Sequence, residues 1–207
     1  MEQLNINEIL DRKNEEQILI NFLDNFNKNK GDILLTRGLY VYGHPGTGKT
    51  QFVTRLLKKM NYDVISYDAG DIRNKKAIEE ITKNNMSATS VVSMFTKKVR
   101  KIVIVMDEID GMNSGDKGGI TSLIKLVRPK KTKKQKKEYV TMIPIICIGN
   151  YHMDKKIKEL IKVCDSYEIK NPTNKEIDFL IRETLLTKDD ELIKNLINYI
   201  QGDLRKL

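Results

Sequence analysis

The sequence predicts an α/β protein, with a five-stranded parallel sheet covered by helices on both faces and a partial all-helical subdomain after it. Five short, apolar, β-rich runs are spread over the first 170 residues, and helical patterns lie between them. Strands that are apolar throughout and alternate with helices are typical of a parallel sheet buried on both faces. The strand signal disappears after Lys170, so we expect a core over residues 1–170 and a helical subdomain over 171–207.

The expected elements follow one another along the chain. A helix with one apolar face, marked by Leu19, Phe22 and Phe26, precedes the first strand. The expected strands are Gly38 to Tyr42, Tyr62 to Tyr67, Ile102 to Met106, Ile143 to Ile148 and Ser166 to Ile169. The expected helices between them are Lys49 to Met60, Lys75 to Thr82, Thr89 to Lys98 and Gly119 to Val127.

The segment after Lys170 carries two helix-start signals. Thr173 to Glu176 has the form of a capping box, in which the first and last side chains bond each other's backbone N–H groups. A second helix is expected to begin near Asp189 and to end at Gly202. These signals predict a pair of helices rather than a further strand.

Composition excludes several classes of protein. With 207 residues, 40% hydrophobic and 31% charged, the chain can form one sizeable core and is not of the disordered class. No apolar run approaches the roughly 18 to 20 residues of a membrane span, and the N-terminus has no signal pattern, so we expect an intracellular protein without a membrane partner. Neither the two cysteines nor the two histidines have metal-ligand spacing, and Cys147 is expected to be a buried thiol.

The positive charge is concentrated in one run. The net charge is +9, and Arg128 to Lys137 (RPKKTKKQKK) holds seven positive residues and no negative one. Such a run is compatible with a solvated, mobile loop, with a phosphate-backbone contact to nucleic acid, or with a nuclear-import signal. Composition alone leaves the three interpretations open.

A phosphate-binding motif follows the first expected strand. The octapeptide GHPGTGKT matches G-x-x-x-x-G-K-[ST] and opens the next helix, which is the context that the motif requires. Its glycines let the backbone wrap phosphates, while the helix N-terminus adds partial positive charge. Lys49 is expected to reach the β- and γ-phosphates of ATP, and Thr50 to bind Mg²⁺. The expected nucleotide-binding residues are Gly43, His44, Pro45, Gly46, Thr47, Gly48, Lys49 and Thr50.

Polar residues end the third and fourth expected strands. Asp107 and Glu108 follow an apolar strand downstream of the phosphate-binding motif. Asp107 is expected to hold Mg²⁺, and Glu108 to activate the water that attacks the γ-phosphorus. Asn150 follows the fourth strand, where its amide could hydrogen-bond the γ-phosphate or position the attacking water. The sequence therefore predicts an Mg²⁺-dependent ATPase.

Together these motifs resemble an AAA+ ATPase, and in particular the large subunit of the replication factor C clamp loader. The segments that carry the resemblance are Tyr67 to Lys75, Met106 to Ile120, Ile143 to Asn150 and Gly202 to Arg205. The resemblance implies that Asn150 is the sensor 1 residue and that Arg205 is sensor 2, which reads the γ-phosphate. It also implies a hetero-oligomer with small clamp-loader subunits, a sliding clamp and primer–template DNA, working in the nucleus or at a viral replication site.

The chain departs from that family in informative places. Small clamp-loader subunits carry Ser-Arg-Cys where this chain has Val163-Cys164-Asp165, and the large subunit also lacks an arginine there. The resemblance therefore implies a subunit that receives an arginine finger and donates none. The basic run is longer than the family pattern, and the chain stops at sensor 2. Against the resemblance, we therefore expect either a minimal version, such as a viral one, or a truncated chain.

Two other functions fit the motifs. An origin initiator or helicase loader is one, because Leu39 to Gly43 and Asp11 to Glu15 also suit that family. The other is an assembly module that holds ATP structurally and turns over little, although Lys49, Asp107 and Glu108 argue against it.

Overall fold

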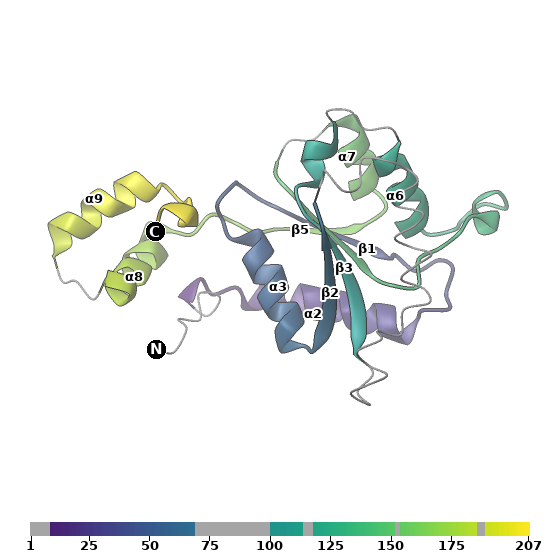
Figure 1. Cartoon of the computed structure of the whole chain (residues 1–207), viewed down its shortest axis with the longest axis horizontal. Helices are drawn as coiled ribbons and strands as arrows, with labels where there is room; N and C mark the ends of the chain where they lie inside the picture. Colours follow the sequence, from purple (N-terminus) through teal and green to yellow (C-terminus); the bar gives the residue numbers. More distant parts are fainter. Residues whose placement is uncertain (1–8, 69–99, 114–117, 152–153, 186–188) are drawn as a thin grey trace.

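Five parallel strands form the centre of the molecule (Figure 1). The computed structural model describes residues 9–68, 100–113, 118–151, 154–185 and 189–207. The sheet has the order β2-β3-β4-β1-β5, and each of its neighbouring pairs is parallel. The strands are β1 (Gly38–Tyr42), β2 (Tyr62–Tyr67), β3 (Lys101–Met106), β4 (Ile145–Gly149) and β5 (Asp165–Glu168).

Helices cover both faces of this sheet, so the predicted fold class is confirmed (Figure 1). Along β1, Leu39 and Val41 pack with Phe52 on one face, whereas Tyr40 packs with Ile120 on the other. This alternation follows from the period of two in a strand, which sends successive side chains to opposite faces. The helices are α2 (Lys13–Lys28) and α3 (Lys49–Lys59) on the first face, and α6 (Gly119–Val127) and α7 (Lys155–Ile161) on the second.

The C-terminal helices form a small body with its own apolar cluster. Glu176 N donates to Thr173 Oγ1 at 3.3 Å while Thr173 N donates to Glu176 Oε2 at 2.6 Å, so the capping box forms as the sequence predicts. Asp189 caps the second helix by accepting from two backbone N–H groups. The elements are α8 (Asn174–Leu185), α9 (Asp190–Ile200) and the 3₁₀ turn η3 (Leu204–Lys206); the buried side chains are Ile177, Ile181, Ile193 and Ile200.

Strand boundaries differ slightly from the sequence prediction. β4 begins at Ile145 and not at Ile143, because Pro144 has no N–H to donate and Ile143 N bonds instead to Thr141 Oγ1 at 3.1 Å. The helices expected over 75–82 and 89–98 lie outside the described residues, as does most of the family-like stretch 67–75. In the described part of the chain, no helix is both long enough and apolar enough to span a bilayer.

The basic run is in part a folded element, which corrects the interpretation of it as a wholly solvated loop. Lys130 is only 1% exposed, and its ammonium donates to Lys125 O and, at 3.2 Å, to Glu138 Oε2. Arg128 forms a two-point ion pair with the same carboxylate, at 2.5 and 3.2 Å. The loop, which includes the 3₁₀ turn η2 (Gln135–Lys137), projects from the end of the molecule away from α8 and α9 (Figure 1). Its exposed charges are Lys131, Lys133, Lys134, Lys136 and Lys137.

Candidate nucleotide-binding site

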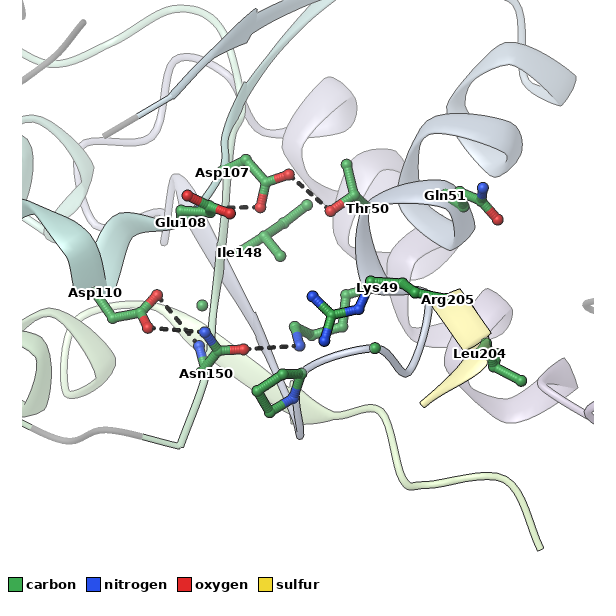
Figure 2. Close-up of a pocket in the computed structure, with 14 residues that line it drawn as sticks. Lys49, Thr50, Gln51, Asp107, Glu108, Asp110, Ile148, Asn150, Leu204 and Arg205 are labelled. Atoms are coloured by element: carbon green, nitrogen blue, oxygen red, sulfur yellow. Dashed lines mark hydrogen bonds between the residues drawn. The ribbon is translucent and has the colours of Figure 1, made fainter. Parts of the chain in front are cut away.

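The strand order brings three functional loops to one edge of the sheet. β4 lies between β1 and β3, so the segments that follow these strands are neighbours at the carboxyl ends. Ligands of open parallel sheets bind in the crevice at this edge. The segments line a cavity of about 360 Å³ (Figure 2). The predicted residues in its lining are Pro45, Gly46, Gly48, Lys49, Thr50, Asp107, Glu108, Asn150 and Arg205.

Lys49 lies at the centre of this site. It is the first residue of α3 and is 8% exposed. Its ammonium donates to three oxygens: Gly43 O at 3.1 Å, His44 O at 2.7 Å and Asn150 Oδ1 at 3.1 Å. The backbone carbonyls therefore hold the charge at the mouth of the loop, where a phosphate would meet it.

Burial lowers the pKa of Lys49, because removal from water disfavours the charged form. The carboxylates of Asp110 and Asp107 act in the opposite direction, and the Arg205 guanidinium lowers the pKa further. A cavity that contains a poorly hydrated cation suits a polyanion such as a nucleoside triphosphate.

Three residues of the phosphate-binding motif, Gly43, His44 and Thr47, are not in the lining of the cavity. Thr47 is fully buried, its hydroxyl donates to His44 O at 3.0 Å, and its carbonyl accepts from Arg12 Nη2 at 2.6 Å. The His44 ring is exposed and lies 4.7 Å from the ring of Tyr151. The hydrogen bonds of Thr47 therefore hold the backbone of the loop in place.

Gly46 is held by the end of the C-terminal subdomain. Its carbonyl accepts from Leu204 N at 2.8 Å. A Cβ at Gly46, which has φ +78°, would lie 1.9 Å from Asp203 Oδ1, so only glycine fits between the loop and this carboxylate. The lid, formed by α8, α9 and η3, and the phosphate loop are therefore in direct contact.

Asp107 and Thr50 provide adjacent oxygens for a metal ion. Thr50 Oγ1 donates to Asp107 Oδ2 at 2.7 Å (Figure 2). Hydroxyl and carboxylate oxygens are the ligands that Mg²⁺ prefers, and it commonly takes one or two protein ligands together with substrate phosphates. The residues present therefore fit the predicted ion.

Glu108 occupies a strained backbone position. It has φ +51°, in the left-handed region that residues other than glycine seldom adopt, and its N–H donates to Asp107 Oδ1 at 2.8 Å. Such strain is typical of functional sites, where the surrounding structure fixes it. The turn leaves the Glu108 side chain exposed in the lining of the cavity, where it can act as a base.

Asp110 is a third carboxylate that the sequence analysis did not identify. It follows Glu108 in the 3₁₀ turn η1 (Ile109–Asn113), lines the cavity, and accepts two hydrogen bonds from Asn150. Its position two residues after the acidic pair was the available signal. Gln51 and Leu204 also line the cavity without having been predicted.

Arg205 enters the cavity from the lid but is already paired. Its side chain is 68% exposed and forms two hydrogen bonds with Asp203, at 2.6 and 2.8 Å. This pairing lowers the pKa of Asp203 to about 2. The predicted sensor 2 residue is thus in the site, held by its own neighbour.

Comparisons with known proteins show which family the chain belongs to. The sequence profile described as "ATPase family associated with various cellular activities (AAA)" matches residues 39–171. Replication factor C subunit 1 of Saccharomyces cerevisiae is 27% identical over 98% of this chain and 25% of its own length. The Drosophila melanogaster protein of the same name is 31% identical over 65% of this chain and 13% of its own length. The Nanoarchaeum equitans replication factor C large subunit is 27% identical over 97% of this chain and 43% of its own length. The chain thus spans less than half of each relative.

Among solved structures, the ADP form of the Aeropyrum pernix ORC2 protein superposes with a TM-score of 0.55. The superposition covers 86% of this chain and 55% of the ORC2 chain. At 12% identity it shows the shared fold alone. The family match and the relatives confirm the predicted resemblance to the replication factor C large subunit. The chain belongs to the AAA family of ATPases.

Proposed function

We propose that this chain is the Mg²⁺-dependent ATPase subunit of a sliding-clamp loader that acts in DNA replication. The observation that carries the proposal is the cavity that joins Lys49, the Thr50–Asp107 pair and Glu108. The similarity to replication factor C large subunits supports the choice of a clamp loader within the family. The partners would then be small loader subunits, a sliding clamp and primer–template DNA, in the nucleus or at a viral replication site.

Each residue of the site has a role that its contacts support. Lys49 would exchange the carbonyls of Gly43 and His44 for phosphate oxygens, since a charge-assisted contact to phosphate is stronger. Thr50 and Asp107 would hold Mg²⁺, which would supply positive charge against the phosphates. Glu108 would accept the proton of the attacking water.

The charges in the site support the proposal that ATP hydrolysis needs a further cation from outside this chain. Lys49 and Arg205 both line the cavity, but the charge of Arg205 is already balanced by its bonds to Asp203. A trans-acting arginine is worth roughly 10³ to 10⁵ in rate in GTPases. We infer that a neighbouring subunit supplies this arginine over the phosphate loop.

Residues at the opposite end of the sheet support the proposal that this subunit receives an arginine finger and donates none. Val163 to Asp165, where small subunits carry Ser-Arg-Cys, lines a second cavity at the start of β5. The arginine in that lining is Arg128, whose guanidinium is engaged by both carboxylate oxygens of Glu138.

The test is steady-state ATP hydrolysis by the chain alone and with candidate small loader subunits. We expect slow hydrolysis by the chain alone and an acceleration of roughly 10³-fold or more with a partner that carries the Ser-Arg-Cys arginine. A partner with that arginine changed to alanine is the control. Glu108→Gln should bind ATP normally and lose roughly 10²-fold or more in hydrolysis. Fast turnover by the lone chain, unaffected by any partner, would contradict the receiving role.

Affinity purification with mass spectrometry separates the remaining alternatives. Recovery of small loader subunits and a clamp supports the proposal, whereas recovery of a helicase or an origin complex would favour an initiator or helicase loader. An assembly module that holds ATP without turnover would show tight binding and no hydrolysis with any partner. The Lys49, Asp107 and Glu108 geometry supports turnover over that alternative.

A further inference from the structure

Asp110, Asn150 and Lys49 form a continuous polar chain across the cavity (Figure 2). Asn150 Nδ2 donates to Asp110 Oδ2 at 3.0 Å, and Asn150 N donates to Asp110 Oδ1 at 3.3 Å. At the other end of the same amide, Lys49 Nζ donates to Asn150 Oδ1 at 3.1 Å. The Asp110 carboxylate therefore accepts from both the backbone N–H and the side-chain NH₂ of Asn150. The Lys49 ammonium donates to the side-chain oxygen of the same residue.

The chemistry of the two neighbours fixes the orientation of the amide. An ionised carboxylate only accepts hydrogen bonds and an ammonium only donates them. A flipped amide would place its NH₂ against the ammonium and its oxygen against the carboxylate, which loses both bonds and adds two repulsions. The oxygen of Asn150 must therefore face Lys49, and its NH₂ must face Asp110.

Tight packing keeps Asp110 against the end of β4. A Cβ at Gly149 would lie 2.4 Å from the Tyr40 hydroxyl and 3.2 Å from Asp110 Oδ1. Tyr40 is 1% exposed, so its hydroxyl has little room to withdraw. The neighbouring Ile109 is fully buried, which anchors the turn that carries Asp110.

We propose that Asp110 is a positioning residue that keeps the Asn150 carbonyl oxygen aimed at the phosphate end of the cavity. The inference rests on the proposed ATPase function. When Lys49 engages phosphate, Asn150 Oδ1 loses its donor and presents an acceptor in the cavity that Glu108 also lines. That acceptor suits the attacking water, which donates, and not a phosphate oxygen, which only accepts. Of the two roles that the sequence allows for Asn150, this orientation of the amide oxygen favours the positioning of water.

Asp110→Asn is the sharpest substitution because it keeps the shape and removes one acceptor. Asp110 accepts two N–H groups, whereas an asparagine side chain offers one acceptor and one donor group. One N–H of Asn150 would then face another N–H, and the amide would lose its fixed orientation. Asp24→Asn on the exposed face of α2 is the control for loss of a negative charge.

The kinetic test is a double-mutant cycle in the full chain, assembled with whichever partner accelerates hydrolysis. Asp110→Asn should lower kcat tenfold or more and leave the Kd for ATP unchanged or tighter, because a negative charge has left the site. In an Asn150→Ala background the same change should alter kcat less than twofold, since the residue through which it acts is gone. If the two losses multiply, Asp110 acts by charge or structure and the proposal is wrong.

A second measurement needs no hydrolysis. In ¹H–¹⁵N spectra the side-chain NH₂ of Asn150, assigned by its loss in Asn150→Ala, should be protected from exchange in the wild type and shift in Asp110→Asn. If the variant fails to fold, the wild-type signal still decides, because free exchange of those protons would overturn the proposal. ATP binding by the wild type, measured alongside, tests the proposed function separately.

Discussion

At the scale of single residues, the site is built from charges whose partners lie inside the protein. Lys49 is nearly buried and bonded to three oxygens, yet it faces a cavity. Burial lowers its pKa, and two carboxylates oppose that effect. The loop thus holds a poorly hydrated ammonium in place before a nucleotide arrives, which reduces the reorganisation needed on binding.

Nucleotide binding should depend on this ammonium. We expect Lys49→Ala to weaken ATP binding tenfold or more, about 1.4 kcal/mol, because it removes a charge-assisted bond to phosphate. Isothermal titration calorimetry measures the effect. Lys59→Ala, an exposed change at the far end of α3, is the matched control. An unchanged affinity in Lys49→Ala would show that this loop does not hold the phosphates.

The Asp203–Arg205 pair in the lid should make a pH-dependent contribution to the stability of the folded protein. The pKa of Asp203 is lowered to about 2 by its hydrogen bonds from Arg205. Because the folded pKa is depressed, this contribution to folding is complete above the unfolded value of about 4 and is lost as the pH falls towards about 2. An NMR titration should find the carboxyl titrating near 2, and Arg205→Ala should raise it towards 4. A pKa near 4 in the wild type would contradict the pair.

At the scale of elements, the basic run divides into a folded base and an exposed outer loop. Arg128 and Lys130 share the carboxylate of Glu138, and their pairing lowers the pKa of that carboxyl group. Burial lowers the pKa of Lys130, and the bond to Glu138 opposes the shift. The base therefore stabilises the loop, and the lysines beyond it are the ones available to another molecule.

The exposed lysines should bind DNA through its phosphates. Changing Lys131, Lys133 and Lys134 to serine should weaken DNA binding similarly for all sequences. It should also flatten the plot of log K against log salt, by up to about 0.9 for each phosphate of duplex DNA that the protein no longer neutralises. Fluorescence anisotropy at several salt concentrations measures both effects. If the triple variant had the same salt slope as the wild type, the loop would be merely solvated and this role would be contradicted.

Lys130→Ser is the contrasting variant within the same run. It removes a buried partner of Glu138 and should reduce the free energy of unfolding by roughly 1 to 3 kcal/mol. The triple variant of exposed lysines should keep the wild-type melting temperature. Thermal denaturation of the two variants thus separates the structural lysine from the exposed ones.

At the scale of the whole molecule, the lid has a smaller apolar core than the domain that contains the sheet. Among the described residues its cluster contains four buried side chains, whereas the clusters on both faces of the sheet are larger. Figure 1 shows α8 and α9 to one side of the sheet. The lid touches the phosphate loop through the bond from Leu204 N to Gly46 O. A ligand that engages both Arg205 and the loop would join the two bodies.

Hydrogen exchange should detect this difference. We expect amides of α8 and α9 to exchange faster than those of β1, β3 and β4, because a small cluster opens at a lower free energy than the core. ATP should slow exchange in the lid, and Arg205→Ala should reduce that protection. Lid amides that exchange as slowly as the core strands without ATP would show that the two bodies open together.

Much of the fold and the chemistry of the site follow from the sequence by itself. The phosphate-binding motif, the acidic pair and the capping box each depend on a few adjacent residues, so glycine spacing and side-chain type are enough to predict them. The strands were predicted within two residues at each end, since apolar runs between helical patterns mark them directly. The boundary between core and lid, and the roles of the site residues, remain predictions.

Tertiary structure alone decided which of these residues meet. The position of β4 between β1 and β3 brings Asn150 to Lys49, 101 positions away in the sequence, and no local pattern encodes that order. The hydrogen bonds from Asn150 to Asp110 and the burial of Lys130 beside Glu138 have the same origin. Whether a charged side chain is exposed, paired or buried depends on partners that distant segments supply, and only the packed fold determines them.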